Sequence, residues 1–426
     1  MVGAALFISL FAFLIFNVPV GIAIGMSSVV AVLVHGGLSL PFVAQGLVTG
    51  TDSFTILAIP LFILAGDLMS KGGVSMRILN VCNVLFGRMT GGLAVVVVTF
   101  CMFFSAVTGS ATATVAAVGS MVVPTMLQKG YSKSFSLALV ATAGGIGIII
   151  PPSIPMVIYG VATQTSIGSL FMAGFIPGML MGALLITFSY VYCKKQGWKG
   201  TDEPFSWRKT IDAIWDAKWA LLNPVIILGG IYGGIFTPTE AAAVAVIYSF
   251  VCGVFLYREL DLKSLIFTMG NTCSTIGVVM IILGCATAFA RILTLEQIPI
   301  ATANFITGIS QSPFIVMLLI NILLLIMGTF MDSAPSMLIF GPILMPVAAL
   351  MGVHPVHFGI IMTINKAIGF LTPPLGTSLF VAAQIGEVNL EVVLKGVMPF
   401  LLVMLIYLMI ITYVAPISMF LPVLLN

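Results

Sequence analysis

The sequence predicts an all-α membrane protein of two inverted repeats, each with about five transmembrane helices, a re-entrant hairpin and a broken helix. Composition is the first observation: 60% of the 426 residues are hydrophobic and only 7% are charged, against about 25% charged in soluble domains. The second is G145-I-G-I-I-I-P-P-S153, where two prolines interrupt an apolar run. The third is that G369-F-L-T-P-P-L-G-T377 repeats this interruption at a fixed distance along the chain.

Composition also excludes several classes of function. The net charge of +3 comes without a basic run that would suit nucleic acid. The six cysteines form no C-x-x-C or Cys/His cluster, so a disulfide framework or a transition-metal site is not indicated. The start of the chain, M-V-G-A-A-L-F, lacks a positive n-region and is expected to open the first membrane helix. Three histidines lie at the ends of predicted segments, where a catalytic role is not expected: His35, His354 and His357.

A constant offset of 222 residues relates the two halves. Adding 222 to Gly147 and Pro151 gives Gly369 and Pro373. Further pairs at this offset are Gly119 and Gly341, Pro124 and Pro346, Gly130 and Gly352, Gly174 and Gly396, and Pro177 and Pro399. Because glycine and proline set backbone shape, their repeated coincidence indicates a repeated structure. The chain therefore divides into repeats at 1–193 and 220–418, joined by a polar linker at 194–219.

The first repeat contains a segment that is too short to cross a bilayer twice. Residues 92–127 have two apolar legs of about 16 residues around T108-G-S-A-T-A-T114, whereas a spanning helix needs about 20. We therefore predict a re-entrant hairpin there, with a counterpart at 313–350 whose turn is M331-D-S-A-P-S336. The other helices expected in this repeat cover 2–16, 20–35, 53–70, 134–165 (the broken helix) and 168–193. The second broken helix is expected at 357–385.

The distribution of Lys and Arg supports this topology. Five crossings per repeat is an odd number, so the second repeat must be inverted. Fourteen of the 16 cations then share one side, which is cytoplasmic by the positive-inside rule. They are Lys71, Arg77, Arg88, Lys129, Lys133, Lys194, Lys195, Lys199, Arg208, Lys209, Lys218, Arg258, Lys263 and Lys395. Arg291 alone falls outside and Lys366 lies within a span. Both termini are thus predicted to be periplasmic.

The linker combines cations with all four tryptophans, at positions 198, 207, 215 and 219. This mixture favours an amphipathic helix in the cytoplasmic headgroup layer. A solvated loop is the alternative.

The paired prolines create unpaired backbone groups. Proline lacks an N–H, so a proline leaves the carbonyl four residues earlier without its helical donor. The carbonyls released in this way belong to Gly147 and Ile148 and to Gly369 and Phe370. Such backbone at membrane depth is tolerated where it is buried or lines a wet cavity. Discontinuous helices in inverted repeats indicate a midplane binding site in secondary transporters, with carbonyls for a cation and helix N-termini for an anion.

Polar side chains in the hairpin turns supply the rest of the expected site. The first turn offers hydroxyls, with Ser105 just before it. The second offers Gly328, Thr329, Asp332, Ser333 and Ser336. Asp332 is a carboxylate deep in a re-entrant element and is expected to bind a cation, although a helix N-cap is an alternative. Lys366 could neutralise Asp332, contact an anionic substrate or snorkel.

Three further acidic residues have structural explanations. Thr237-Pro-Thr-Glu240 reads as a capping box with proline at the first helical position. Asp52 and Asp67 are expected near membrane ends, where they face water or cap helices.

Several motifs together resemble the large membrane subunit of TRAP transporters, the tripartite ATP-independent periplasmic transporters of bacteria. They are I-P-L-F-I-L-A-G-D (ending at Asp67), V-T-G-S-A-T-A-T (ending at Thr114), I-I-P-P-S-I-P (ending at Pro155), F-T-P-T-E-A (ending at Ala241) and L-T-P-P-L-G (ending at Gly376). The resemblance implies an inner-membrane importer of organic acids, sialic acid or C4-dicarboxylates, coupled to sodium and working by an elevator motion. It also implies two partners, a separate small membrane subunit and a periplasmic substrate-binding protein.

The resemblance also implies site residues, with sodium as the sole metal and no other cofactor. Sodium would lie between each hairpin turn and the neighbouring break, at Ser105, Gly109, Ser110 and Gly147, and at Gly328, Asp332, Ser333, Gly369 and Thr372. Apart from the resemblance, in which Lys366 is a departure, we expect the substrate to meet Thr112, Thr114, Pro152, Ser153, Lys366, Pro374 and Thr377.

A stand-alone sodium/dicarboxylate symporter of related elevator fold is the main alternative function. A channel would need a continuous polar pore, whereas the polar groups here cluster at two breaks. An intramembrane protease would need a Ser/His pair, H-E-x-x-H or paired aspartates, and the sequence offers no convincing example. The chain is therefore not expected to be an enzyme.

Overall fold

The computed structural model describes residues 1–16, 18–198, 200, 206–374 and 376–425, which fold into helices without a strand. The first repeat holds α1 (Val2–Ile15), α2 (Val20–His35), α3 (Leu40–Thr49), α4 (Ala58–Lys71), α5 (Val74–Phe86), α6 (Gly92–Thr108), α7 (Ala111–Gln128), α8 (Lys133–Gly144), the 3₁₀ turn η1 (Gly145–Ile148), α9 (Ile154–Thr163) and α10 (Ile167–Gln196). The second holds α11 (Trp207–Tyr232), α12 (Pro238–Val251), the π-helical η2 (Cys252–Leu256), α13 (Leu262–Leu295), α14 (Ile298–Ile309), α15 (Pro313–Gly328), α16 (Ser333–Leu350), α17 (Pro355–Gly369), α18 (Thr377–Gly386), α19 (Leu390–Tyr413) and α20 (Pro416–Leu425).

The helices of the two repeats occur at equivalent positions along the chain, as the glycine and proline pairs predict. Shifting the bounds of α7, 111–128, by 222 gives 333–350, the bounds of α16. Shifting α6, 92–108, gives 314–330, close to α15 at 313–328. Among the described residues, seven helices are long and apolar enough to cross a membrane, including α10, α13 and α19. The prediction of an all-helical, multi-pass fold with repeated hairpins and broken helices is confirmed.

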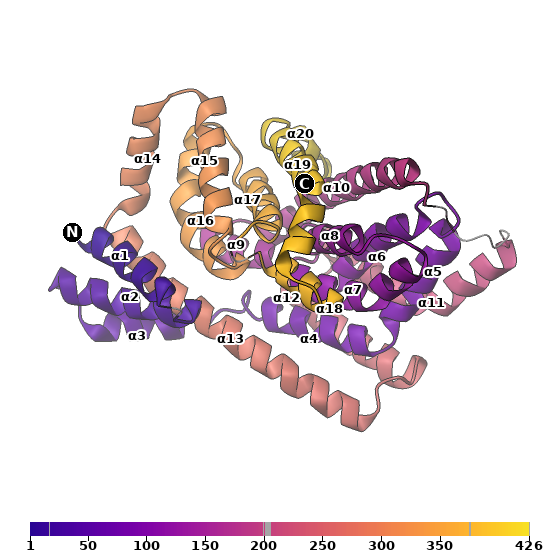
Figure 1. Cartoon of the computed structure of the whole chain (residues 1–426). Coiled ribbons are helices and arrows are strands. Elements are labelled where there is room, and N and C mark those ends of the chain that lie inside the picture. The colour runs from indigo at the N-terminus through magenta and orange to yellow at the C-terminus, as the bar shows by residue number, and fades with distance from the viewer. Residues whose placement is uncertain (17, 199, 201–205, 375, 426) are drawn as a thin grey trace.

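One helix differs between the repeats. In the second repeat α13 runs unbroken for 34 residues, or about 50 Å at 1.5 Å per residue. In the first repeat the equivalent stretch is divided into α3 and α4 around G50-T-D-S-F-T-I-L57. The helix predicted at 53–70 was wrong at its start, because turn-forming Gly, Asp and Ser delay it to Ala58. Figure 1 shows α13 running along one side of the molecule, past α4, towards α1–α3.

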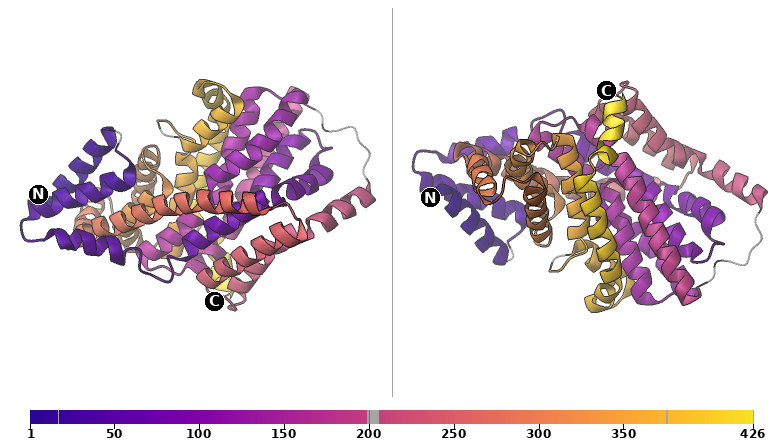
Figure 2. Two further views of the ribbon diagram at one scale, coloured as in Figure 1. Left: turned by 90° about the horizontal axis from the view of Figure 1, so that it is seen from below. Right: turned by 90° about the horizontal axis from the view of Figure 1, so that it is seen from above.

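The helices form a scaffold and a hairpin-bearing body. In the scaffold, α13 packs on α2, α3 and α4, and α12 packs on α4 and α11. In the body, the two repeats interlock: α9 packs against α16 of the second hairpin, and α18 packs against α7 of the first. The two further views in Figure 2 show α1–α3 at the end opposite α11.

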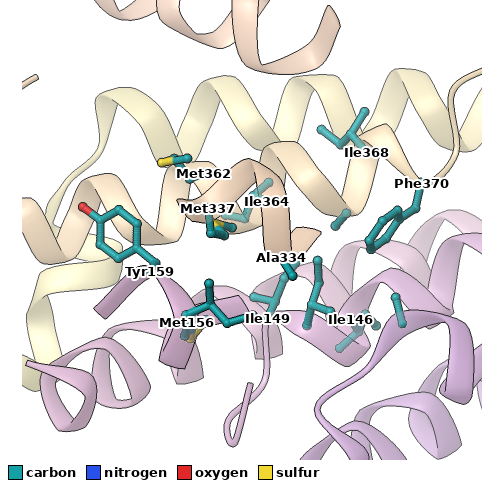
Figure 3. Packing of buried hydrophobic residues seen from close by; sticks show 14 of the residues in the cluster. Ile146, Ile149, Met156, Tyr159, Ala334, Met337, Met362, Ile364, Ile368 and Phe370 are labelled. Atoms are coloured by element: carbon teal, nitrogen blue, oxygen red, sulfur yellow. The ribbon is translucent and has the colours of Figure 1, made fainter. Parts of the chain in front are cut away.

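The contact between the repeats is apolar. Ile146, Ile149 and Met156 of the first broken helix lie beside Ala334 and Met337 of α16 in Figure 3. All five side chains are buried. Burial of this kind stabilises at roughly 25 cal/mol per Å² of apolar surface against water, so the breaks are held in place by the packing of their flanks.

The linker does not form a helix of its own. Helix α10 continues to Gln196, and α11 begins at Trp207 and runs on to Tyr232. The prediction of a separate helix over 194–219 is therefore replaced by an amphipathic extension of α11; residues 199 and 201–205 lie outside the described part. Trp215 is 69% exposed and the Lys218 ammonium lies 3.6 Å from the centre of its ring, a pairing suited to the headgroup layer.

Candidate functional site

The first break joins the first hairpin turn through the backbone. Two prolines, linked by a cis peptide bond, end η1. Ser153 then caps α9, accepting from the N–H of Met156 at 3.4 Å and donating to the carbonyl of Ile148 at 2.6 Å. The next N–H, of Ile154, donates to the carbonyl of Gly109 in the hairpin turn at 3.4 Å. The broken helix and the turn are thus one hydrogen-bonded junction.

Oxygen atoms gather at this junction. Thr114 donates its hydroxyl to the carbonyl of Ser110 at 2.7 Å, and its Oγ1 lies 3.2 Å from Oγ1 of Thr108. A Cβ on Gly147 would come within 2.7 Å of the Ser110 carbonyl and 2.8 Å of Thr114 Oγ1. No turn or cap hydrogen bond from the described residues reaches the carbonyl of Gly147. Ser105 stands one helical turn back and donates to Cys101. Carbonyl and hydroxyl oxygens without nitrogen ligands suit a hard cation.

The second break contacts its hairpin through the backbone. A Cβ on Gly369 would meet both Cα and the carbonyl oxygen of Gly328 at 2.8 Å. The carbonyl of Gly369 accepts from the N–H of Thr372 at 3.1 Å. The sequence argument that Pro373 leaves this carbonyl free is therefore wrong, because a 3₁₀-type turn supplies a donor three residues on. Thr372 itself donates its hydroxyl to Ile368 at 3.0 Å.

Two charged residues distinguish the second turn. Asp332 is the N-cap of α16, accepting from the N–H of Ser333 at 2.7 Å, so the capping role holds whether or not a cation binds. Lys366, on α17, is only 2% exposed and donates to the carbonyl of Met331 at 3.0 Å. The position equivalent to Lys366 in the first repeat, 366 minus 222, is Gly144.

A cavity of about 450 Å³ lies between the hairpins and the scaffold. The first turns of three helices line it, those of α7, α9 and α16, and the positive dipole end of each favours an anion there. The predicted site residues that line it are Gly109, Ser110, Thr112, Asp332 and Ser333. The others lie outside its lining: Ser105, Thr114, Gly147, Pro152, Ser153, Gly328, Lys366, Gly369, Thr372, Pro374 and Thr377.

Hydroxyls near the second break lack partners. Oγ1 of Thr377 and Oγ of Ser378 are buried at the start of α18, and neither has a hydrogen-bond partner in the described part of the chain. Oγ of Ser336 in α16 is in the same condition. A buried hydroxyl without a partner costs about 1–3 kcal/mol, so these groups are available to a ligand or to water.

The scaffold contributes residues that the sequence did not assign to a site. Asp67, Ser70 and Thr275 line the cavity opposite the first hairpin turn. Asp67 is half-buried and accepts from the hydroxyl of Thr272 at 2.5 Å, which joins α4 to α13. The expectation for Asp67, that it faces water or caps a helix, did not include this bond to α13. An acid at the end of the apolar run I-P-L-F-I-L-A-G-D was the available signal.

A second cavity, of about 590 Å³, lies between α3 and α13 of the scaffold and α9 and α16 of the body. Arg291 lines it together with Gln164 and Thr287. Arg291 is the one cation that the sequence places on the periplasmic side. Two cavities therefore lie between the scaffold and the body, one of them lined by this cation.

The fold has two interlocked repeats, each with a hairpin and a broken helix, and a cavity between them and the scaffold. One known family matches nearly the whole chain. The family model described as the tripartite ATP-independent periplasmic transporter, DctM component, matches residues 7–417. The chain belongs to the DctM family of TRAP transporters. Membership also sets aside the enzyme classes, because the curated relatives are named as transporter permeases.

Relatives of this DctM-family chain differ in the substrates in their names. It is 47% identical to the isethionate TRAP transporter permease protein DctMQ of Oleidesulfovibrio alaskensis, covering 96% of this chain but 64% of that protein. It is 40% identical to the C4-dicarboxylate TRAP transporter large permease protein DctM of Pseudomonas aeruginosa, covering 94% and 93%. It is 38% identical to the sialic acid TRAP transporter large permease protein SiaM of Vibrio cholerae, covering 95% of each.

A solved structure supports the fold alone. The YdaH transporter of Alcanivorax borkumensis, described as having an unusual topology, aligns with a TM-score of 0.60 at 15% identity over 88% of each chain.

Proposed function

We propose that this chain is the translocating subunit of a sodium-coupled importer of small organic anions in the bacterial inner membrane. The observation that carries the proposal is the oxygen-lined junction of the first hairpin turn with the first break. There the Ser110 carbonyl and the Thr114 hydroxyl lie together beside the backbone of Gly147. Sodium bound there orders the turn whose residues also line the 450 Å³ cavity.

The anion binds in that cavity. Three helix N-termini face it, and Thr112 and Ser110 add hydroxyls that can donate to a carboxylate or sulfonate. The substrates in the relatives' names, isethionate, C4-dicarboxylates and sialic acid, are all organic acids. The cavity of about 450 Å³ accepts any of them, so the proposed substrate is a small organic acid.

Coupling follows from the shared turn. Sodium orders 108–114, the ordered turn completes the anion site, and each ligand therefore raises the affinity for the other by the same factor. The loaded body moves against the scaffold of α1–α4 and α11–α13 in an elevator motion, exchanging access between the 450 Å³ cavity and the one lined by Arg291. Both termini are periplasmic in this arrangement.

The proposed partners are a small membrane subunit and a periplasmic binding protein. The relative named DctMQ is longer than this chain, which spans 64% of it, and its additional length is compatible with a fused small subunit. Arg291, Gln164 and Thr287 give the predicted periplasmic side a polar cavity into which a binding protein can release an anion.

Uptake in proteoliposomes tests the proposal. The chain is reconstituted with its small subunit and binding protein, a sodium gradient is imposed, and uptake of isethionate, succinate and sialic acid is followed. We expect uptake of one of these acids that requires sodium and stops when the binding protein is omitted. Uptake of similar rate in choline would contradict sodium coupling. Uptake that persists without the binding protein would favour the stand-alone symporter instead.

A further inference from the structure

Lys366 is the one Lys, Arg, Asp or Glu that is buried among the described residues. Burying an ammonium group is costly unless other groups replace its hydration. The Lys366 side chain donates a hydrogen bond to the Met331 carbonyl at 3.0 Å. The carboxylate of Asp332, the residue after Met331, interacts with it electrostatically. The fold therefore places the Lys366 amino group at the second hairpin turn, where sodium was expected from the sequence.

The first repeat holds the equivalent carbonyl in a different way. Subtracting 222 from Met331 gives Gly109, whose carbonyl accepts from the backbone N–H of Ile154 on the far side of the first break. Subtracting 222 from Lys366 gives Gly144, which has no side chain to offer. Equivalent carbonyls are therefore held by a backbone amide in one repeat and by an ammonium in the other.

Two other roles for Lys366 disagree with its position. A snorkelling lysine carries its head group to water, but this ammonium ends on a carbonyl inside the protein. A substrate contact needs access to the anion, and Lys366 does not line the 450 Å³ cavity. Its neighbour Asp332 does line that cavity, where an uncompensated carboxylate would repel an organic anion.

We propose that Lys366 is a resident cation, which holds the second hairpin turn through the Met331 carbonyl, whereas the first turn depends on a bound sodium ion. The inference rests on the proposed sodium coupling at the first turn. An ammonium offers three donors and a full positive charge to carbonyl and carboxylate oxygens. The second turn is consequently ordered without sodium, and it stays electrically neutral beside the anion because Lys366 offsets Asp332.

Hydrogen exchange on the full chain in lipid nanodiscs tests this without first requiring a variant. Exchange in 108–114 and 328–334 is compared between sodium chloride and choline chloride at equal ionic strength. We expect sodium to slow exchange in the first turn by about tenfold and to change the second by less than about twofold.

Three variants separate charge from shape. Lys366→Met keeps an unbranched side chain but removes the ammonium, and exchange in 328–334 should rise by about tenfold or more in either salt. Lys366→Arg keeps the charge and should restore most of the protection. Lys395→Met removes an exposed lysine of α19 and should leave both turns unchanged.

The outcomes distinguish this inference from the proposed function. If sodium slows 328–334 as strongly as 108–114 in the unmodified chain, or if Lys366→Met leaves 328–334 protected, Lys366 is not the cation of the second turn. If neither turn responds to sodium while Lys366→Met still opens the second, sodium coupling fails and Lys366 keeps its role.

Discussion

The first and second breaks share one backbone plan and differ in chemistry. Both place a pair of prolines after a glycine that touches a hairpin, at Gly147 and Gly369. The first junction is made of uncharged oxygens around Thr114. The second carries Lys366 and Asp332. The repeat therefore preserves the positions that shape the backbone, while the groups that bind cations or anions differ between the halves.

The two glycines also contact different parts of their hairpins. Gly147 approaches the start of the second leg, at Ser110 and Thr114, whereas Gly369 approaches the end of the first leg, at Gly328. The first contact leaves hydroxyl and carbonyl oxygens facing the break. The second is a contact of two glycine backbones.

The largest effects are expected from adding one methyl group at either break. In Gly147→Ala the new Cβ would lie 2.7 Å from the Ser110 carbonyl, and in Gly369→Ala 2.8 Å from that of Gly328. Backbone cannot retreat as a flexible side chain can, so each should destabilise its junction by about 1–3 kcal/mol. We expect uptake to fall tenfold or more in both, measured at matched amounts of reconstituted protein.

Gly277→Ala is the control for this pair, because a Cβ there meets nothing within 4 Å and the residue lies in α13. Normal uptake by Gly147→Ala would mean that the close contact of the first turn with the break is not needed for transport.

Removing one hydroxyl from each hairpin should have a smaller and unequal effect. Thr114 and Ser336 are equivalent, since 114 plus 222 is 336, and both are buried. Thr114→Val removes an oxygen from the first junction and should raise the sodium concentration for half-maximal uptake by about tenfold, the loss of one interaction of roughly 1.4 kcal/mol. Ser336→Ala removes a hydroxyl that has no partner among the described residues and should leave the sodium dependence within about twofold.

Equal rises in the two variants would show that sodium binds both turns. In that case the difference in charge between the breaks would not be a difference in coupling.

Sequence reasoning reached the architecture because glycine and proline restrict the backbone directly. The pairs at an offset of 222 predicted the repeats, and the short apolar legs predicted hairpins whose residues coincide with α6 and α7 and with α15 and α16. It did not anticipate the length of α13. This helix is apolar throughout, and its continuity becomes evident only when it is compared with the first repeat, where the turn at 50–57 divides the equivalent stretch.

The site was harder to predict for a physical reason. Proline removes a donor at a known position, but which group compensates depends on the third dimension. Thus Ile148 and Gly369 regain partners from Ser153 and Thr372, whereas the carbonyl of Gly147 gains none from a turn or cap within the part of the chain that the structure describes. Asp67 was missed because its partner, Thr272, lies 205 residues away.

The smallest effect should come from Asp332→Asn, which separates capping from charge. Asparagine caps a helix about as well as aspartate, so the bond to the N–H of Ser333 and the thermal stability should be kept within about 0.5 kcal/mol. The loss of an exposed carboxylate beside the cavity leaves Lys366 uncompensated and favours an anion. Screening limits this gain in affinity, so the concentration of the transported acid that gives half-maximal uptake should fall by about threefold at most.

Asp52→Asn, another exposed carboxylate but one outside the cavity lining, controls for the change in net charge. The sodium dependence of Asp332→Asn then decides between the two accounts of the second turn. If Lys366 is the resident cation, sodium dependence stays with the first turn and is unchanged. If Asp332 binds sodium, the concentration for half-maximal uptake rises by about tenfold, because a charged ligand contributes more than a neutral one. The same variant thus measures how far the two breaks have diverged, since only one of these results is compatible with a second turn that carries its own cation.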